Sequence, residues 1–173
     1  MKKTFYKVGM MSILGISMFS ASLFDNTSTA AAQEKVTINS NQHEITMNNL
    51  NQYNGFRVKE VGKPTIYLID NGTKRGITSP EVYNHLFRNW DNVQEFLTLS
   101  GVPDGKVLND NIGLVRFENS PKVYLLDKNN QGNTIKRWIT SPAAMDKYNF
   151  KWDMPTMPSW MENNIPDGAP INY

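Results

Sequence analysis

The stretch IYLIDNGTKRGITSP, residues 66–80, decides the fold, because the chain repeats its pattern as VYLLDKNNQGNTIKRWITSP at residues 123–142. Both stretches begin with a similar hydrophobic run and end in Ile-Thr-Ser-Pro, and the second has five more residues between these ends. The match extends to a Trp-Asp pair and a Pro-Asp-Gly turn in each copy: Trp90-Asp91 and Trp152-Asp153, then residues 102–105 and 165–168. A match that keeps its order over this distance indicates tandem duplication of a whole folding unit.

Each copy predicts a β-hairpin followed by a short helix. In the first copy, residues 56–59 and 65–70 alternate with the two-residue period of strands. Asn71-Gly72 predicts a tight hairpin turn, because both residues tolerate positive φ. A helix should begin at Ser79-Pro80 and again at Ser141-Pro142, since serine caps a helix N-terminus and proline lacks the N–H that would be unpaired there.

The copies are expected to differ after the shared tryptophan. Residues 92–97 are compatible with a helix in the first copy. The prolines within residues 154–158 exclude a continuous helix at the corresponding place in the second copy.

The chain divides into five segments: a signal peptide in residues 1–32, a polar leader with a possible edge strand in 33–54, repeat 1 in 55–108, a linker in 109–112 and repeat 2 in 113–173. Each repeat would be marginally stable alone and the linker is short, so we expect the two repeats to share one core. The predicted fold class is α+β, with two tandem repeats packed as one domain, each a small antiparallel hairpin-rich sheet with a short helix.

The N-terminal segment has the pattern of a secretory signal peptide. Lys2, Lys3 and Lys7 give a basic start, an apolar stretch follows in residues 8–24, and small alanines precede Gln33. The apolar stretch contains several glycines and serines and is shorter than the roughly 20 residues of a spanning helix, which argues against a membrane anchor. We therefore expect a secreted protein that is extracellular or loosely associated with the cell wall.

Cysteine content and charge indicate the source of the protein and the kind of partner it binds. The chain contains no cysteine, so it forms no disulfide bond, and export without disulfides favours a Gram-positive bacterium as its source. Of the 18 basic and 16 acidic residues, three and one lie in the signal peptide, which leaves 15 of each and no net charge. This balance argues against nucleic acid as the main partner, since proteins that bind it carry a basic excess or a basic face.

The repeat resembles a short tandem unit of secreted and surface-attached bacterial proteins, in which it often accompanies wall-degrading or carbohydrate-active domains. The resemblance covers about residues 55–171 and rests on a VYL(I/V)(D/E)-x-G-x-KR-x-I hairpin, a short helix, a Trp-Asp pair and a closing IP(D/T)G. It implies an extracellular accessory or binding role. Repeat 1 departs from repeat 2 by having Gly76 where Trp138 stands, so an aromatic platform at this position is expected once.

Residues that usually carry catalysis are scarce. His43 and His85 are the chain's two histidines, neither is duplicated, and the sequence has no zinc-binding spacing and no Gly-x-Ser-x-Gly motif. The repeated acids could serve a glycosidase, but each has a structural interpretation at a strand end or a turn. They are Asp70 and Asp127, Asp91 and Asp153, and Asp104 and Asp167. We expect no enzyme activity, no cofactor and no metal site, since residues 127–133 resemble a calcium loop only loosely.

Aromatic residues are the first candidates for binding. Trp90 and Trp152 recur with the fold and are predicted to be core residues, as are the repeated Tyr67 and Tyr124. Surface aromatics can stack on the apolar side of a sugar ring. The tryptophans predicted to do so are Trp138 and Trp160.

The Lys-Arg pairs are the second candidates. Arg75 and Arg137 occupy equivalent positions and could meet an anionic wall polymer. A simpler interpretation is that they are solvated charges that protect a sheet edge from pairing. The predicted ligand-binding residues are therefore Arg75, Arg137, Trp138 and Trp160.

The sequence predicts a secreted, non-catalytic binding module whose first-choice ligand is a cell-envelope glycan or an anionic wall polymer. A second hypothesis is a secreted factor that binds an extracellular protein, as an inhibitor, adhesin or toxin-like protein would. A small glycan hydrolase is the third, and it would need acids such as Glu81 and Asp153 to converge in one pocket. In each case we expect no membrane span after signal cleavage.

Overall fold

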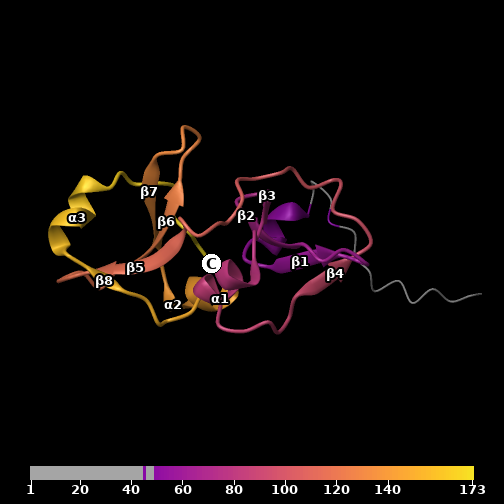
Figure 1. Ribbon diagram of the computed structural model, residues 1–173, viewed down its shortest axis with the longest axis horizontal. Helices are drawn as coiled ribbons and strands as arrows, with labels where there is room; N and C mark the ends of the chain where they lie inside the picture. Colours follow the sequence, from indigo (N-terminus) through magenta and orange to yellow (C-terminus); the bar gives the residue numbers. More distant parts are fainter. Residues whose placement is uncertain (1–44, 46–48) are drawn as a thin grey trace, which may run out of the picture. The chain divides into compact units, whose positions relative to one another are not determined.

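The computed structural model describes residues 45 and 49–173. The predicted signal peptide and most of the polar leader lie outside the described residues. Each repeat forms a four-stranded sheet with a short helix, and the two sheets pack together, as Figure 1 shows. The predicted α+β fold of two tandem repeats is therefore confirmed.

The described strands and helices of the two repeats correspond, except that repeat 2 has a further helix near its end. Repeat 1 contains β1 (Arg57–Glu60), β2 (Ile66–Asp70), β3 (Thr73–Gly76), α1 (Pro80–Leu86) and β4 (Gln94–Phe96). Repeat 2 contains β5 (Gly113–Phe117), β6 (Val123–Lys128), β7 (Thr134–Ile139), α2 (Pro142–Lys147), β8 (Thr156–Met157) and the further helix α3 (Ser159–Asn164). A 3-10 helix, η1 (Leu50–Tyr53), precedes repeat 1.

The two sheets have the same topology. Their strand orders are β3-β2-β1-β4 and β7-β6-β5-β8. The hairpin strands pair antiparallel, as predicted, while β4 and β8 lie parallel to β1 and β5. The prediction that residues 92–97 could be helical is wrong, because Gln94–Phe96 form β4 and bury Phe96. Pairing with β1 and burial of this ring outweigh the weak helix propensity of so short a segment.

The hairpin turn and the helix starts follow their sequence signals. Asn71 and Gly72 have φ values of 50° and 72°, the left-handed backbone that a primed turn requires. Ser79 Oγ and Ser141 Oγ each accept a hydrogen bond from the backbone N–H three residues later, at 3.3 and 3.1 Å. Because a proline follows each serine, α1 and α2 begin in the same way.

The two repeats share one hydrophobic core, as predicted. The core contains side chains of β2 and β6 and of the helices α1 and α2, which lie beside one another between the sheets in Figure 1. Leu68, Leu86, Leu125 and Phe150 are completely buried within it. Each such side chain contributes about 1.5–3 kcal/mol on burial, so this core holds the two sheets together.

The described end of the leader packs on the outer side of repeat 1. Ile45, Leu50 and Tyr53 form a second cluster with Val58 and Phe96. The leader's predicted edge strand is not present in residues 49–54, which form a turn and η1. The remaining leader, apart from Ile45, lies outside the described residues.

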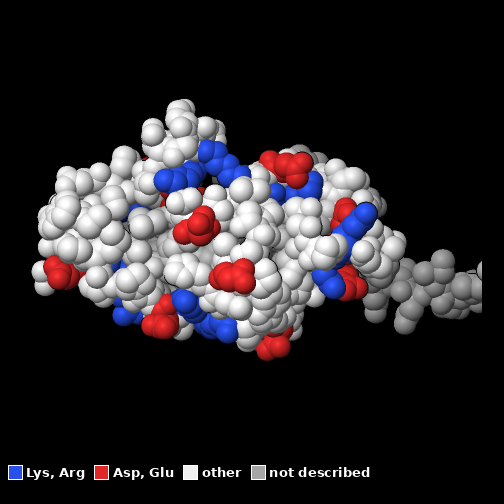
Figure 2. Space-filling view, in the orientation of Figure 1, with Lys and Arg blue, Asp and Glu red and all other residues white. Residues whose placement is uncertain are grey.

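The surface carries charges of both signs. Figure 2 shows acidic and basic side chains interspersed over one face of the molecule. This distribution agrees with the equal numbers of acidic and basic residues after residue 32. Among the helices of residues 45 and 49–173, none has the length and apolar character needed to cross a membrane.

Gly105, in the Pro-Asp-Gly turn of repeat 1, packs closely on β3. A Cβ atom here would lie 2.3 Å from Thr73 Oγ1 and 3.0 Å from Arg75 Cγ. We expect Gly105→Ala to lower the free energy of unfolding by about 1–3 kcal/mol, since overpacking forces neighbouring atoms to move. Gly101→Ala is the matched control, because its Cβ would lie 3.5 Å from Ile45 O, an ordinary contact distance. Urea unfolding compares the two variants, and equal stability would contradict the prediction.

Candidate functional site

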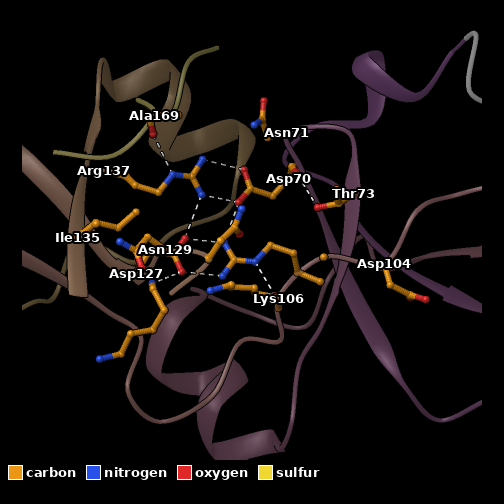
Figure 3. A pocket seen from close by; sticks show the side chains of 14 residues that line it. Asp70, Asn71, Thr73, Asp104, Lys106, Asp127, Asn129, Ile135, Arg137 and Ala169 are labelled. Carbon is orange, nitrogen blue, oxygen red and sulfur yellow. Dashed lines mark hydrogen bonds and ion pairs between the residues drawn. The ribbon is translucent and has the colours of Figure 1, made fainter. Parts of the chain in front are cut away.

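A buried cluster of charged side chains lies where the two repeats meet, and Figure 3 shows it. Asp70 and Arg75 come from repeat 1, Asp127 and Arg137 come from repeat 2, and all are at most 7% exposed. Arg75 binds Asp127 with two hydrogen bonds of 2.7 Å, and Arg137 binds Asp70 with bonds of 2.5 and 3.0 Å. Two bonds within the repeats complete this ion-pair cluster: Arg75 donates to Asp70 at 2.9 Å, and Arg137 donates to Asp127 at 3.2 Å.

The strand register explains why the cluster forms. Leu68 of β2 lies opposite Arg75 of β3, so the two side chains are on the same face of the sheet. Asp70 is two residues beyond Leu68 and shares that face. The same register in repeat 2 places Asp127 and Arg137 on the corresponding face. Each repeat therefore offers a carboxylate and a guanidinium to the other.

The arginines keep both buried carboxylates charged. Burial alone would raise the pKa of Asp70, but hydrogen bonds and charge from Arg137 and Arg75 outweigh it and hold that pKa below its ordinary value. Burial would also raise the pKa of Asp127, but the hydrogen bonds and charge of Arg75 outweigh it and lower that pKa. The two carboxylates in turn raise the pKa values of both guanidinium groups. These shifts favour the charged form of each group, so at neutral pH the cluster carries two positive and two negative charges.

Acid is expected to weaken the fold through this cluster. A carboxylate whose pKa is lower in the folded chain stabilises the fold above the unfolded pKa, about 3.9 for aspartate, and this stabilisation is lost as the pH falls through the folded pKa. We expect the free energy of unfolding to be level down to about pH 5 and to fall steeply below about pH 4.

Urea unfolding as a function of pH measures this acid loss. Asp104→Asn is the control, because the Asp104 side chain is 84% exposed and lies outside the cluster, so this variant should keep the same acid loss. The double variant Arg75→Met/Asp127→Leu should show a smaller one. A stability that stays level below pH 4, or an unchanged profile in the double variant, would contradict the role assigned to the cluster.

The interpretation of Arg75 and Arg137 as solvated edge charges is wrong. Arg75 and Arg137 are 4% and 7% exposed, because a carboxylate of the other repeat neutralises each one. Their Nε atoms donate to the backbone carbonyls of Lys106 and Ala169 at 2.8 and 2.9 Å. Both arginines also line an open cleft of about 610 Å³. Their contact with a ligand stays a prediction, and their donors are largely engaged within the protein.

Trp90 and Trp152 are surface residues, and their prediction as core residues is wrong. They are 47% and 43% exposed, close to the 41% of Trp138, whereas Tyr124 is buried as predicted. The indole of Trp90 lies flat on the buried ring of Tyr83, with ring centroids 3.9 Å apart. Tyr83 thus occupies the core position, and the tryptophan covers it from outside.

Two of the surface grooves are equivalent between the repeats. The Trp90 groove, of about 330 Å³, lies between the start of β2, the end of β3 and the beginning of α1. The Trp152 groove, of about 220 Å³, has the same place in repeat 2. Each position lining the first has its repeat partner lining the second: residues 64–66, 77–80, 83 and 90, and residues 121–123, 139–142, 145 and 152. The lining positions of each groove lie within a single repeat, and the Arg88 guanidinium of repeat 1 lies 5.7 Å from the ring centroid of Trp152.

A buried hydrogen-bond network holds the Trp90 platform in place. Arg57, which is 5% exposed, donates to the hydroxyl of Tyr83 and, at 2.6 Å, to the backbone carbonyl of Asn89. The Tyr83 hydroxyl donates to the same carbonyl at 3.0 Å, and burial raises the pKa of this hydroxyl. The indole N–H of Trp90 donates to Asn84 Oδ1 at 2.8 Å. With one face on Tyr83 and its N–H bonded, the indole has its other face left for a ligand.

A threonine hydroxyl borders each groove. Thr78 Oγ1 donates to Leu108 O at 3.1 Å, and Thr140 Oγ1 donates to Ile171 O at 3.2 Å. A hydroxyl has one proton and two lone pairs, so both oxygens are left as hydrogen-bond acceptors. Each groove therefore combines an aromatic face with an acceptor for an O–H or N–H group of a ligand.

The grooves differ in charge and in aromatic content. Repeat 2 has Lys122, Trp138 and Met145 where repeat 1 has Thr65, Gly76 and Tyr83. Lys122 Nζ lies 5.1 Å from the ring centroid of Trp138, so a cation adjoins the second indole of this groove. Trp160 is 65% exposed on α3 and lies outside both grooves. The ligand-binding role of Trp160 stays a prediction.

Several repeated acids are engaged with basic residues of the protein. One pair belongs to the ion-pair cluster. Asp104 binds Lys74 of β3, and Asp167 binds Lys136 of β7, each with an N–O distance of 2.9 Å. These acids therefore tie the Pro-Asp-Gly turns to the sheet edges.

The acids named for a hydrolase do not meet in the pocket that Glu81 lines. That pocket also contains His85 and Asp110, but not Asp153. Within residues 45 and 49–173, no group of three or more histidine, aspartate or glutamate side chains is placed to hold a metal ion.

Comparisons of the chain with protein-family models, with curated proteins and with solved structures found no match. The features of the molecule that indicate a function are the two tryptophan grooves and the interface that positions them.

Proposed function

We propose that this protein is a secreted, non-catalytic binding module that recognises a cell-wall glycan through the Trp90 and Trp152 grooves. The observation that carries the proposal is the duplication of an exposed tryptophan together with its groove. Two copies of one groove suit a ligand that presents the same group many times, because a second contact then adds avidity. A polysaccharide is such a ligand.

The chemistry of each groove matches a sugar ring. The apolar C–H face of a sugar can lie on an indole, while a small number of polar groups fixes its orientation. Sugar hydroxyls can donate to Thr78 and Thr140, whose own protons are already donated to backbone carbonyls. Lys122 adds a positive charge to the groove of repeat 2, so an anionic substituent on the glycan would be bound better there.

The lining of the grooves supports binding without hydrolysis. Neither groove contains an aspartate, a glutamate or a histidine among its described lining residues. A glycosidase needs two carboxyl groups that flank the scissile bond. The grooves lack this pair, so we assign them no reaction.

Co-sedimentation with purified Gram-positive sacculi tests the proposal. The chain from Gln33 onward, which keeps every described residue, is mixed with sacculi before and after removal of their anionic polymers, at low and high salt. We expect saturable binding in all conditions, with a modest loss at high salt, because Lys122 is the one charged residue among the described lining residues of the two grooves. Complete loss with the polymers would reassign recognition to charge. No binding in any condition would contradict the proposal and favour a protein target.

Trp138→Ala is expected to weaken binding at the groove of repeat 2 by several-fold to about tenfold, without a change in thermal stability. The indole is 41% exposed, and repeat 1 folds with Gly76 at this position, so the fold does not need the side chain. The loss corresponds to one aromatic contact of about 0.5–1.5 kcal/mol. Binding isotherms and thermal melts measure the two quantities. Unchanged binding, or a large fall in melting temperature, would contradict the prediction.

A further inference from the structure

The two repeats are related by an approximate twofold rotation. Arg75 of repeat 1 binds Asp127 of repeat 2, and the equivalent Arg137 of repeat 2 binds Asp70 of repeat 1. Contacts that are exchanged in this way characterise a twofold interface, in which the same surface of each partner faces the other. A head-to-tail arrangement of repeats would not produce them.

The backbone shows the same relation at the junction of the repeats. Phe87, after α1, and Phe150, after α2, pair as an antiparallel bridge. Arg88 N donates to the carbonyl of residue 149, and Lys151 N donates to the carbonyl of residue 86, both at 3.0 Å. Phe150 is one position beyond the repeat equivalent of Phe87, and antiparallel pairing of such nearly equivalent segments is approximately symmetric about a twofold axis. This axis therefore carries the Trp90 groove onto the Trp152 groove.

A twofold rotation restricts how a directional ligand can occupy both grooves. A glycan strand has a reducing and a non-reducing end. If the strand runs across the axis, the rotation reverses the direction that the second groove requires. If the strand runs along the axis, the grooves lie at the same height on opposite sides, and a straight strand reaches one of them. One straight strand cannot fill both grooves in the same direction.

We infer that one molecule binds two glycan strands, one in each groove, and thereby cross-links them. The inference rests on the proposed function, and it adds the arrangement of the ligand. Each groove is lined by residues of its own repeat, which allows the two to be filled independently. The shared core and the ion-pair cluster fix the orientation of one groove relative to the other. The bound strands are therefore held at a set geometry.

Light scattering from sonicated fragments of Gram-positive sacculi tests the cross-linking. As the chain from Gln33 is added, scattering should rise and then fall in excess protein, because excess protein occupies each strand singly. Trp90→Ala and Trp152→Ala should each keep binding through the intact groove but lose the clustering completely. Tyr173→Ala is the control, since it removes a 79% exposed aromatic ring outside both grooves, and it should cluster the fragments normally.

Ultracentrifugation of the same samples measures binding separately from clustering. Wild-type protein that binds the fragments without clustering them would overturn the cross-linking and leave the proposed function intact. Clustering that persists in both single variants would also overturn it, because a chain with one groove cannot bridge two strands. Absence of binding by the wild-type protein would overturn the inference and the proposed function together.

Discussion

Arg75→Met is expected to lower the free energy of unfolding by about 3–5 kcal/mol, the largest effect we expect from a single substitution in this molecule. The change removes the guanidinium that binds Asp127 through two hydrogen bonds of 2.7 Å and leaves that carboxylate buried at 4% exposure. Asp127 keeps the 3.2 Å bond to Arg137, but two buried carboxylates then share one guanidinium, and a buried charge that is only partly compensated is costly. Methionine keeps much of the side-chain volume, so the loss comes mainly from charge and not from packing.

A double-mutant cycle separates this cost from the value of the ion pair itself. Arg75→Met, Asp127→Leu and the double variant are unfolded in urea beside the wild-type protein. We expect the double variant to be more stable than Arg75→Met, because it removes the excess carboxylate and leaves Arg137 with Asp70 alone. If Arg75→Met loses less than about 1 kcal/mol, the cluster contributes no more than a surface ion pair, and its role at the repeat interface is refuted.

The double variant Trp90→Ala/Trp152→Ala is expected to lose at least about 30-fold in glycan affinity at each groove, which removes measurable binding. Aromatic anchors at binding sites contribute 2 kcal/mol or more, and this corresponds to a factor of about 30. The fold should survive, because both indoles are more than 40% exposed in the free protein. Trp90 gives up its stacking on Tyr83 and its bond to Asn84, at a cost of about 1–2 kcal/mol.

Co-sedimentation with sacculi and thermal melts check this variant. Tyr173→Ala, which removes an exposed aromatic ring elsewhere, should bind as the wild-type protein does. If the double variant melts normally and binds normally, the glycan site lies outside both grooves. If it fails to fold, Trp90→Phe keeps an aromatic ring on Tyr83 and measures the effect on binding in a stable protein.

Local features of the fold can be predicted because they depend on neighbouring residues. The turn at Asn71-Gly72 needs two residues that accept positive φ, and the caps at Ser79 and Ser141 need a hydroxyl beside the first turn of a helix. The duplicated pattern then extends each local prediction to a second sheet. The parallel strand β4 cannot be predicted in this way, because Gln94 pairs with the distant Val58 and this pairing forms only in the assembled sheet.

The tryptophan prediction fails because recurrence alone does not distinguish a core residue from a repeated surface residue. The neighbours of Trp90 provide a signal, since Arg88-Asn89 precede it and Asp91-Asn92 follow it. Such polar surroundings are unusual for a buried side chain. The role of Tyr83 beneath the indole becomes evident only from the packing of α1.

The sequence indicates the two buried carboxylates of the ion-pair cluster, but it does not indicate which arginine pairs with each one. Asp70 falls at the two-residue period after Ile66 and Leu68, which puts a carboxylate on a face that is otherwise apolar. The recurrence of this pattern at Asp127 indicates that both charges belong to the core face of the fold. The pairing of each carboxylate with the arginine of the other repeat depends on how the sheets pack, which no local pattern encodes.

Titration calorimetry with short, soluble glycan fragments released from Gram-positive sacculi tests the central claim most directly. Because each repeat carries a complete groove, we predict two binding sites per chain. Trp90→Ala and Trp152→Ala should each reduce this number to one. A single site in the wild-type chain, or no heat of binding at concentrations where sacculi are bound, would contradict the account of two equivalent tryptophan grooves.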